Sequence, residues 1–128
     1  MSESTLEYEF VFPKGERFLI VRARGELNKA TLEHAIVETV TTAEDAEVSR
    51  LLIDAREVRI TGTIPEIVSA ARSSRYPEAG KLNNMKRVIL VSEYGCLQDL
   101  LVRVMRSRGQ QIEITTDEDH ARLLCSKE

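Results

Sequence analysis

The chain of 128 residues is 42% hydrophobic and 30% charged, and its formal net charge is −3. This length is near the commonest domain size and can bury one complete hydrophobic core, so we expect residues 1–128 to form a single domain. The composition excludes an intrinsically disordered chain, and the slightly acidic balance argues against non-specific binding to nucleic acid. A folded domain with no nucleic-acid partner is therefore the first expectation.

The N-terminal residues carry neither the basic start nor the apolar centre of a secretory signal peptide. No stretch approaches the roughly 18 consecutive apolar residues of a membrane-spanning helix. Cys96 and Cys125 are predicted to lie on two different helices. Because a chain that can build a core needs no disulfide, both thiols are expected to be reduced. These features predict a cytoplasmic protein without a transmembrane segment.

The first third of the chain begins with a predicted β-hairpin. Residues 5–12 alternate polar and apolar as a half-buried strand does, a turn with proline and glycine follows, and residues 18–24 form a second apolar run. Gly25 is predicted to end that strand. Asn28 can then cap a helix over residues 29–41, whose apolar residues recur at helical spacing. The hairpin is thus followed by an amphipathic helix.

The remainder alternates single strands with single helices. Strands are predicted at 50–54, at 87–92 and around Ile112 and Ile114, and helices at about 64–75, at about 95–108 and after a cap at Thr116 or Asp117. The order is therefore ββαβαβαβα. Because parallel strands joined by one helix need right-handed crossovers, this order predicts an α/β fold: a mixed, mostly parallel sheet with the hairpin at one edge and about four helices packed against it.

A capping box marks the start of the predicted helix at residue 64. Thr63 precedes Glu66 by three residues, and Pro65 lies in the first turn, where a proline is tolerated. Residues 55–62 are predicted to form the loop that leads from the preceding strand to this helix. A phosphate on Thr63 would lie at a helix N-terminus, where free backbone N–H groups and the helix dipole favour an anion. Thr63 can equally be a simple helix cap.

The hairpin-first order, the strand Leu51-Leu52-Ile53-Asp54 with Val58 after it, and the helix-opening Thr63 resemble the STAS domain, specifically the stand-alone SpoIIAA-like relatives of bacterial anti-sigma-factor antagonists. The resemblance covers residues 5–126. It implies a bacterial, non-enzymatic module that docks onto a partner protein and is switched by phosphorylation at the start of the helix after the third strand. The antagonists carry Asp-Ser-Ser-Gly there, whereas this chain reads Thr61-Gly62-Thr63-Ile64-Pro65. Thr63 and Thr61 are the candidate phosphosites that the resemblance implies.

The residue types argue against an enzyme or a metal site. His34 and His120 are predicted to be exposed, and neither has a cysteine or carboxylate at metal-ligand spacing. No glycine-rich phosphate loop is present. Cys96 follows Gly95 at a predicted helix start, where the dipole can activate a thiol, but a small residue at such a junction needs no chemical role. We therefore expect no catalytic residue, no metal and no cofactor.

The predicted helix 64–75 is rich in small residues, which permit the close approach of another protein surface. Together with residues 55–62 it forms the candidate interaction surface, whose predicted contacts are Arg56, Arg59, Ile67, Ala70, Ala71 and Ser74. The partner would be an unidentified protein or a second copy of the chain, as a homodimer. In the alternative function, a carrier or sensor holds a small apolar or anionic ligand between the sheet and the helices, and residues 76–84 act as a lid.

Overall fold

The computed structural model describes residues 5–71, 80–82, 84–93, 95–107 and 109–127. Within these residues the chain forms a five-stranded sheet whose strands lie side by side in sequence order. The strands are β1 (Leu6–Val11), β2 (Leu19–Leu27), β3 (Arg50–Ile60), β4 (Lys86–Leu90) and β5 (Ile112–Thr115). β1 runs antiparallel to β2 at one edge, and the other neighbouring pairs are parallel. The predicted α/β order and mostly parallel sheet are confirmed.

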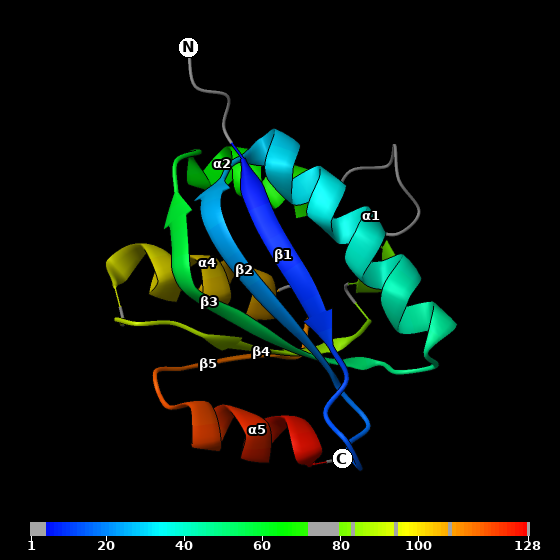
Figure 1. The fold of residues 1–128 in the computed structure, drawn as a ribbon. Helices are drawn as coiled ribbons and strands as arrows, with labels where there is room; N and C mark the ends of the chain where they lie inside the picture. The colour runs from blue at the N-terminus through cyan, green and yellow to red at the C-terminus, as the bar shows by residue number, and fades with distance from the viewer. Residues whose placement is uncertain (1–4, 72–79, 83, 94, 108, 128) are drawn as a thin grey trace.

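Helices cover both faces of the sheet (Figure 1). In the described residues they are α1 (Lys29–Asp45), α2 (Ile64–Ala71), α4 (Cys96–Arg106) and α5 (Glu118–Ser126). Leu51 and Ile53 of β3 pack with α1, whereas Leu52 between them packs with α5. Ile89 of β4, which pairs with Ile53, packs with α4. Because side chains alternate along a strand, α1 and α4 share one face of the sheet and α5 covers the other.

Two predicted boundaries are wrong. β2 does not end at Gly25 but continues to Leu27, and residues 55–60 extend β3 instead of forming a loop. The two extensions pair with each other in parallel, Gly25 opposite Val58 and Leu27 opposite Ile60, after a shift in register. Val58 and Ile60 face the layer of α1, α2 and α4, where they line a cavity. Arg56, Glu57 and Arg59 concealed this strand, because their charges interrupt the apolar pattern that continues from the strand at 50–54.

The helices begin where their caps were predicted. Asn28 caps α1, and Asp117 accepts hydrogen bonds from two backbone N–H groups at the start of α5. α1 extends to Asp45, beyond the predicted residue 41. α2 is described to Ala71, so residues 72–75, like most of the predicted lid, lie outside the described part of the chain. No helix of the described part is long and apolar enough to cross a membrane.

An ion-pair network joins β3 to α5. The Arg56 guanidinium donates to both carboxylate oxygens of Asp54, at 2.9 and 2.8 Å, and to Glu118 in the first turn of α5, at 2.8 Å. The hydrogen bonds from Arg56 are the main cause that lowers the pKa of Asp54, and the bond to Asp54 in turn raises the pKa of Arg56. Arg56 therefore holds the start of α5 to the sheet while Asp54 is ionised.

Replacing Gly25 with alanine should destabilise the fold. Gly25 has a φ of 118°, and a Cβ there would collide with the carbonyl oxygen of Thr5. Gly15 is a matched control, because its φ is 81° but no neighbouring atom lies within 4 Å of the corresponding Cβ position. In urea titrations we expect Gly15→Ala to lower the free energy of unfolding by about 1 kcal/mol and Gly25→Ala to lower it by about 3 kcal/mol. Equal losses would show that the collision is unimportant.

The Asp54–Arg56 pair should stabilise the fold only where Asp54 is ionised. Because the pKa of Asp54 is lower in the folded chain than its ordinary 3.8, the stabilisation is complete above that value and disappears as the pH falls below it. Asp54→Asn should therefore lower the free energy of unfolding by about 1 kcal/mol at neutral pH, and this effect should shrink as the pH falls below 3.8. Denaturant titrations over this range measure the difference.

Asp99→Asn is the control for that measurement. Asp99 pairs with Arg103 at 3.0 Å, but the Arg103 side chain is 75% exposed. Loss of this ion pair should therefore lower the free energy of unfolding less than loss of the Asp54–Arg56 pair does. An effect of Asp54→Asn that does not vary with pH would argue for lost packing instead of a lost ion pair.

Candidate functional site

The connection from β3 to α2 contains both candidate phosphosites. The backbone N–H groups of Thr61 and Gly62 donate to the carbonyl oxygen of Leu27, at 2.9 and 3.2 Å. A Cβ on Gly62 would lie 3.2 Å from the Cα of Asn28, so glycine permits this close approach. Backbone contacts therefore hold the β3–α2 connection against the β2–α1 connection.

Thr63 forms the predicted capping box with Glu66. The Glu66 backbone N–H donates to Thr63 Oγ1 at 3.3 Å, and the Thr63 backbone N–H donates to Glu66 Oε1 at 3.2 Å. The Thr63 hydroxyl also donates to this carboxylate oxygen, at 2.9 Å. The backbone hydrogen bond from Thr63 is the main cause that lowers the pKa of Glu66. Both residues are exposed, so Thr63 is accessible although its hydroxyl already has a partner.

A second helix start lies beside the first. α1 opens with its own capping box, in which the Thr31 N–H donates to the Asn28 side chain at 3.0 Å and the Asn28 N–H donates to Thr31 Oγ1 at 2.9 Å. Because β2 and β3 are parallel neighbours, α1 and α2 begin at the same end of the sheet (Figure 1). Ligands of α/β sheets bind outside the carboxyl ends of strands, and helix N-termini favour anions.

The exposed residues of this region form one candidate site. We call it the β3–α2 surface and define it as Arg59, Thr61, Thr63 and Glu66, all of which are exposed. Arg59 pairs only at 3.4 Å with Glu26, and its side chain is 77% exposed. The structure therefore brings both candidate phosphosites together with one of the predicted contacts.

Three other predicted contacts, Ile67, Ala70 and Arg56, are not part of this surface. Ile67 is 2% exposed and Ala70 is 1% exposed, so both belong to the core and a partner would not contact them directly. Arg56 is engaged with α5 through Glu118. The Ala71 side chain and Ser74 lie outside the described residues. Small residues on a helix permit close packing, but their sequence does not say whether the neighbour is a partner or the protein's own core.

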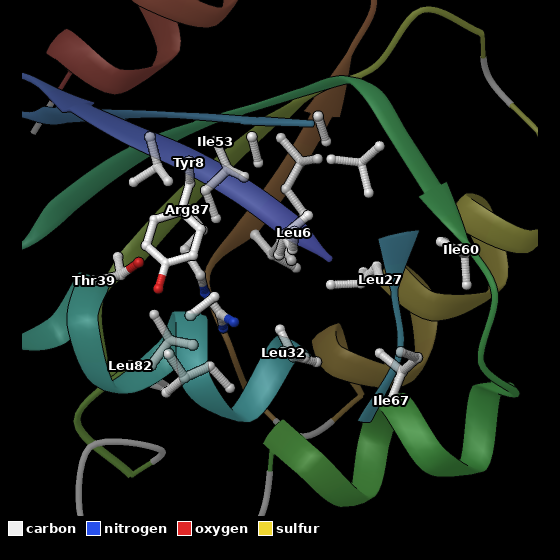
Figure 2. Close-up of a pocket in the computed structure, with 18 of the residues that line it drawn as sticks. Leu6, Tyr8, Leu27, Leu32, Thr39, Ile53, Ile60, Ile67, Leu82 and Arg87 are labelled. Atoms are coloured by element: carbon white, nitrogen blue, oxygen red, sulfur yellow. The ribbon is translucent and has the colours of Figure 1, made fainter. Parts of the chain in front are cut away.

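A cavity of about 190 Å³ lies between the sheet and the helices α1, α2 and α4 (Figure 2). Most of its lining side chains are apolar, and the polar ones are Tyr8, Thr39 and Arg87. The sequence suggested a ligand space between sheet and helices as an alternative, but it identified none of these three residues. Arg87 precedes the apolar run 88–91 and was included in the predicted strand, with no sign that its side chain would be buried.

The Tyr8 hydroxyl belongs to a small polar cluster with α1. The pKa of Tyr8 is raised to about 12, mainly by burial and secondly by a hydrogen bond with Glu38, so the phenol stays neutral. Glu38 also lies 2.7 Å from His34. The Glu38 carboxylate therefore interacts with Tyr8 and His34 and forms no ion pair with Arg87.

The remaining chemistry-bearing residues form no further site within the described residues. His34 and His120 are exposed, as predicted. No group of three or more histidine, cysteine or acidic residues in the described ranges could hold a metal ion. Cys125 is a buried free thiol, and burial raises its pKa to about 11, which makes it a poor nucleophile. The side chain of Cys96 lies outside the described residues.

Comparison with models of known protein families finds no match, and comparison with curated protein sequences finds none either. Solved structures do resemble the chain. An uncharacterized protein of the DUF3478 family from Shewanella loihica, described as having a SpoIIAA-like fold, aligns with a TM-score of 0.64 at 15% identity, over 98% of this chain and 97% of its own. An anti-sigma factor antagonist from Mycobacterium paratuberculosis aligns with a TM-score of 0.62 at 16% identity, over 96% of each chain.

The anti-sigma factor antagonist SpoIIAA is similar in both of its states. Its unphosphorylated form aligns with a TM-score of 0.54 at 13% identity, over 92% of this chain and 97% of its own. The phosphorylated form, described as a Bacillus cell fate determinant, aligns with a TM-score of 0.51 at 12% identity, over 92% and 99%. Together with the strand order and the edge hairpin, these alignments show that the chain has the SpoIIAA-like fold that its sequence resembles.

Proposed function

We propose that the chain is a non-enzymatic regulatory module of the STAS type that works in the cytoplasm and binds a protein partner through the β3–α2 surface. The anti-sigma factor antagonists with the same fold support this class of function and suggest an anti-sigma factor, or a protein like it, as the partner. The observation that carries the proposal is the exposed Thr63, which lies at a helix N-terminus on a connection held by the backbone of Leu27 and packed against Asn28.

Phosphorylation of Thr63 would act on the surface charge. A phosphothreonine carries roughly −1.5 to −2 charges at neutral pH. Glu66 Oε1 lies 2.9 Å from the Thr63 hydroxyl oxygen, so the carboxylate and the phosphate would repel and Glu66 would leave the cap. The phosphate oxygens could then accept hydrogen bonds from the N–H groups at the start of α2. A partner that binds the unphosphorylated surface would then face the added negative charge of the phosphate.

Two positive side chains favour an acidic segment as the part of the partner that docks. Lys29, at the start of α1, is exposed, and its charge contributes to the lowered pKa of Glu66. Arg59 is exposed beside Thr61, and its pair with Glu26 is too exposed to hold it tightly. A phosphate on Thr63 would compete with carboxylates of the partner for these cations.

Intact-mass measurement of the protein purified from its source cells, with and without phosphatase, tests the phosphorylation. We expect a phosphatase-sensitive form that disappears in Thr63→Ala and persists in Thr61→Ala. Thr61 is a matched control, because it is also exposed and its hydroxyl donates weakly to the Leu27 carbonyl, at 3.5 Å. If neither threonine is ever modified, the phosphorylation switch is wrong.

Quantitative affinity purification tests the surface itself. With tagged variants as bait, we expect Thr63→Glu and Arg59→Glu each to retain the partner at least about tenfold less than the unmodified chain does. Lys14→Glu is the control: Lys14 is exposed in the β1–β2 turn, at the opposite end of β2 from the β3–α2 surface. Thermal unfolding is followed in parallel, because loss of the Thr63 cap costs about 1 kcal/mol. Equal retention by all three variants would exclude the β3–α2 surface as the docking site.

A further inference from the structure

Arg87 places a charge in the apolar layer between the sheet and the helices. It lies in β4 with Leu51 of β3 and Ile112 of β5 as its neighbours in register, and both neighbours are buried. Arg87 itself is 3% exposed, and Figure 2 shows its guanidinium among the side chains that line the cavity. Because a guanidinium stays protonated at physiological pH, this is a buried positive charge.

Within the described residues this charge is poorly compensated. One terminal nitrogen donates to the side-chain oxygen of Gln110, which is neutral. The Nε atom has no hydrogen-bond partner, and burial lowers the pKa of Arg87 to about 10, the direction expected for a cation without an anionic neighbour. An unpaired buried charge is costly, so the site favours an anion.

Three acidic side chains on the surrounding elements have other partners. On α1, Glu38 contacts His34 at 2.7 Å, and Glu44 contacts Lys81 at 3.1 Å. On the neighbouring strand β5, Glu113 pairs with Arg106 at 3.5 Å. None of these three carboxylates pairs with Arg87, so within the described residues they leave its charge for an anionic ligand.

The cavity itself has a polar and an apolar end. In Figure 2 the Arg87 guanidinium lies on the same side as Tyr8 and Thr39, whereas Leu27, Ile60 and Ile67 lie on the opposite side. The rest of the lining that the described residues provide is apolar. Since a cavity of about 150 Å³ can hold benzene, the volume of about 190 Å³ has room for roughly eight non-hydrogen atoms.

We propose that this cavity binds a small amphipathic carboxylate, whose carboxylate group contacts the Arg87 guanidinium and whose apolar part points toward Leu27, Ile60 and Ile67. The fork of an arginine matches a carboxylate through two parallel hydrogen bonds, and the unused Nε is one of the donors that such a pair needs. The carboxylate group takes three of the roughly eight non-hydrogen atoms, so an aliphatic chain or small ring of about five further carbons fills the apolar part. Such a ligand lies inside the helix layer, and its binding does not depend on a partner at the β3–α2 surface.

Calorimetric titration of the full chain with hexanoate, 1-hexanol and acetate tests this site. Hexanoate is expected to bind at least about tenfold more tightly than 1-hexanol, which keeps the chain but lacks the charge. Acetate keeps the charge but lacks the chain, and no binding is expected. Equal affinities for hexanoate and 1-hexanol, or no binding of hexanoate, would overturn the proposal. This comparison needs no variant, so it holds whether or not a substituted protein folds.

Arg87→Met removes the cation and keeps a long apolar side chain. We expect it to weaken hexanoate binding at least about tenfold, to leave 1-hexanol binding unchanged or stronger, and to raise the melting temperature of the unliganded protein, because an unpaired buried charge is removed. Arg103→Met is the matched control, since the Arg103 side chain on α4 is 75% exposed, and it should change neither affinity.

Ala35→Leu tests the volume of the cavity. Ala35 lines the cavity, so a larger side chain there should weaken the binding of hexanoate and of 1-hexanol together. If Arg87→Met leaves hexanoate binding intact, or if Arg103→Met weakens it as much, the carboxylate is not held by Arg87 and the assignment is wrong.

Discussion

The parallel pairing of β2 with β3 is the constraint on which the rest of the structure depends. It runs from Leu19 opposite Leu51 to Leu27 opposite Ile60. Because the two strands end together, the helices that follow them begin together, and the two capping boxes become neighbours. Gly25 lies within this pairing and fixes the other side of β2: the strand passes the Thr5 carbonyl so closely that no side chain fits, and Glu26 donates a backbone hydrogen bond to that carbonyl at 2.8 Å.

The same pairing makes the two candidate sites adjacent. Ile60 and Ile67 line the cavity, and residues 61–63 between them carry the exposed threonines. A Cβ on Gly62 would lie 3.6 Å from the Ile67 side chain, so the outer connection rests directly on the apolar end of the cavity. The connection between β3 and α2 therefore carries the β3–α2 surface on its outer side and borders the cavity on its inner side.

The two faces of the sheet differ in how completely they are packed. Under α5, Phe18, Leu52 and Cys125 are at most 1% exposed and form a continuous apolar cluster. The layer under α1, α2 and α4 instead contains a cavity and the charge of Arg87. A cavity and a buried cation both lower the stability of a folded chain, so this layer loses stability that the α5 face does not. The space for a ligand therefore lies on the face that α1, α2 and α4 cover.

Features that depend on neighbours within a few residues could be predicted from the sequence. The order of strands and helices follows from local hydrophobic periodicity, and the caps at Asn28, Thr63 and Asp117 need only a side chain and the backbone of the next turn. The resemblance to SpoIIAA-like proteins rests on the same local patterns, and the alignments with solved structures confirm it for the fold.

Other features depend on residues that are distant in the sequence, and only the tertiary structure decided them. The strand at 55–60 exists because the end of β2, about thirty residues earlier, lies alongside it. Ile67 and Ala70 are core residues because the rest of the fold covers that face of α2, which helical spacing alone could not show. The sequence by itself determined the elements and their caps. The burial of Arg87 and the space beside it were decided only when helices packed over β4, because burial belongs to the assembled layers and not to any one segment.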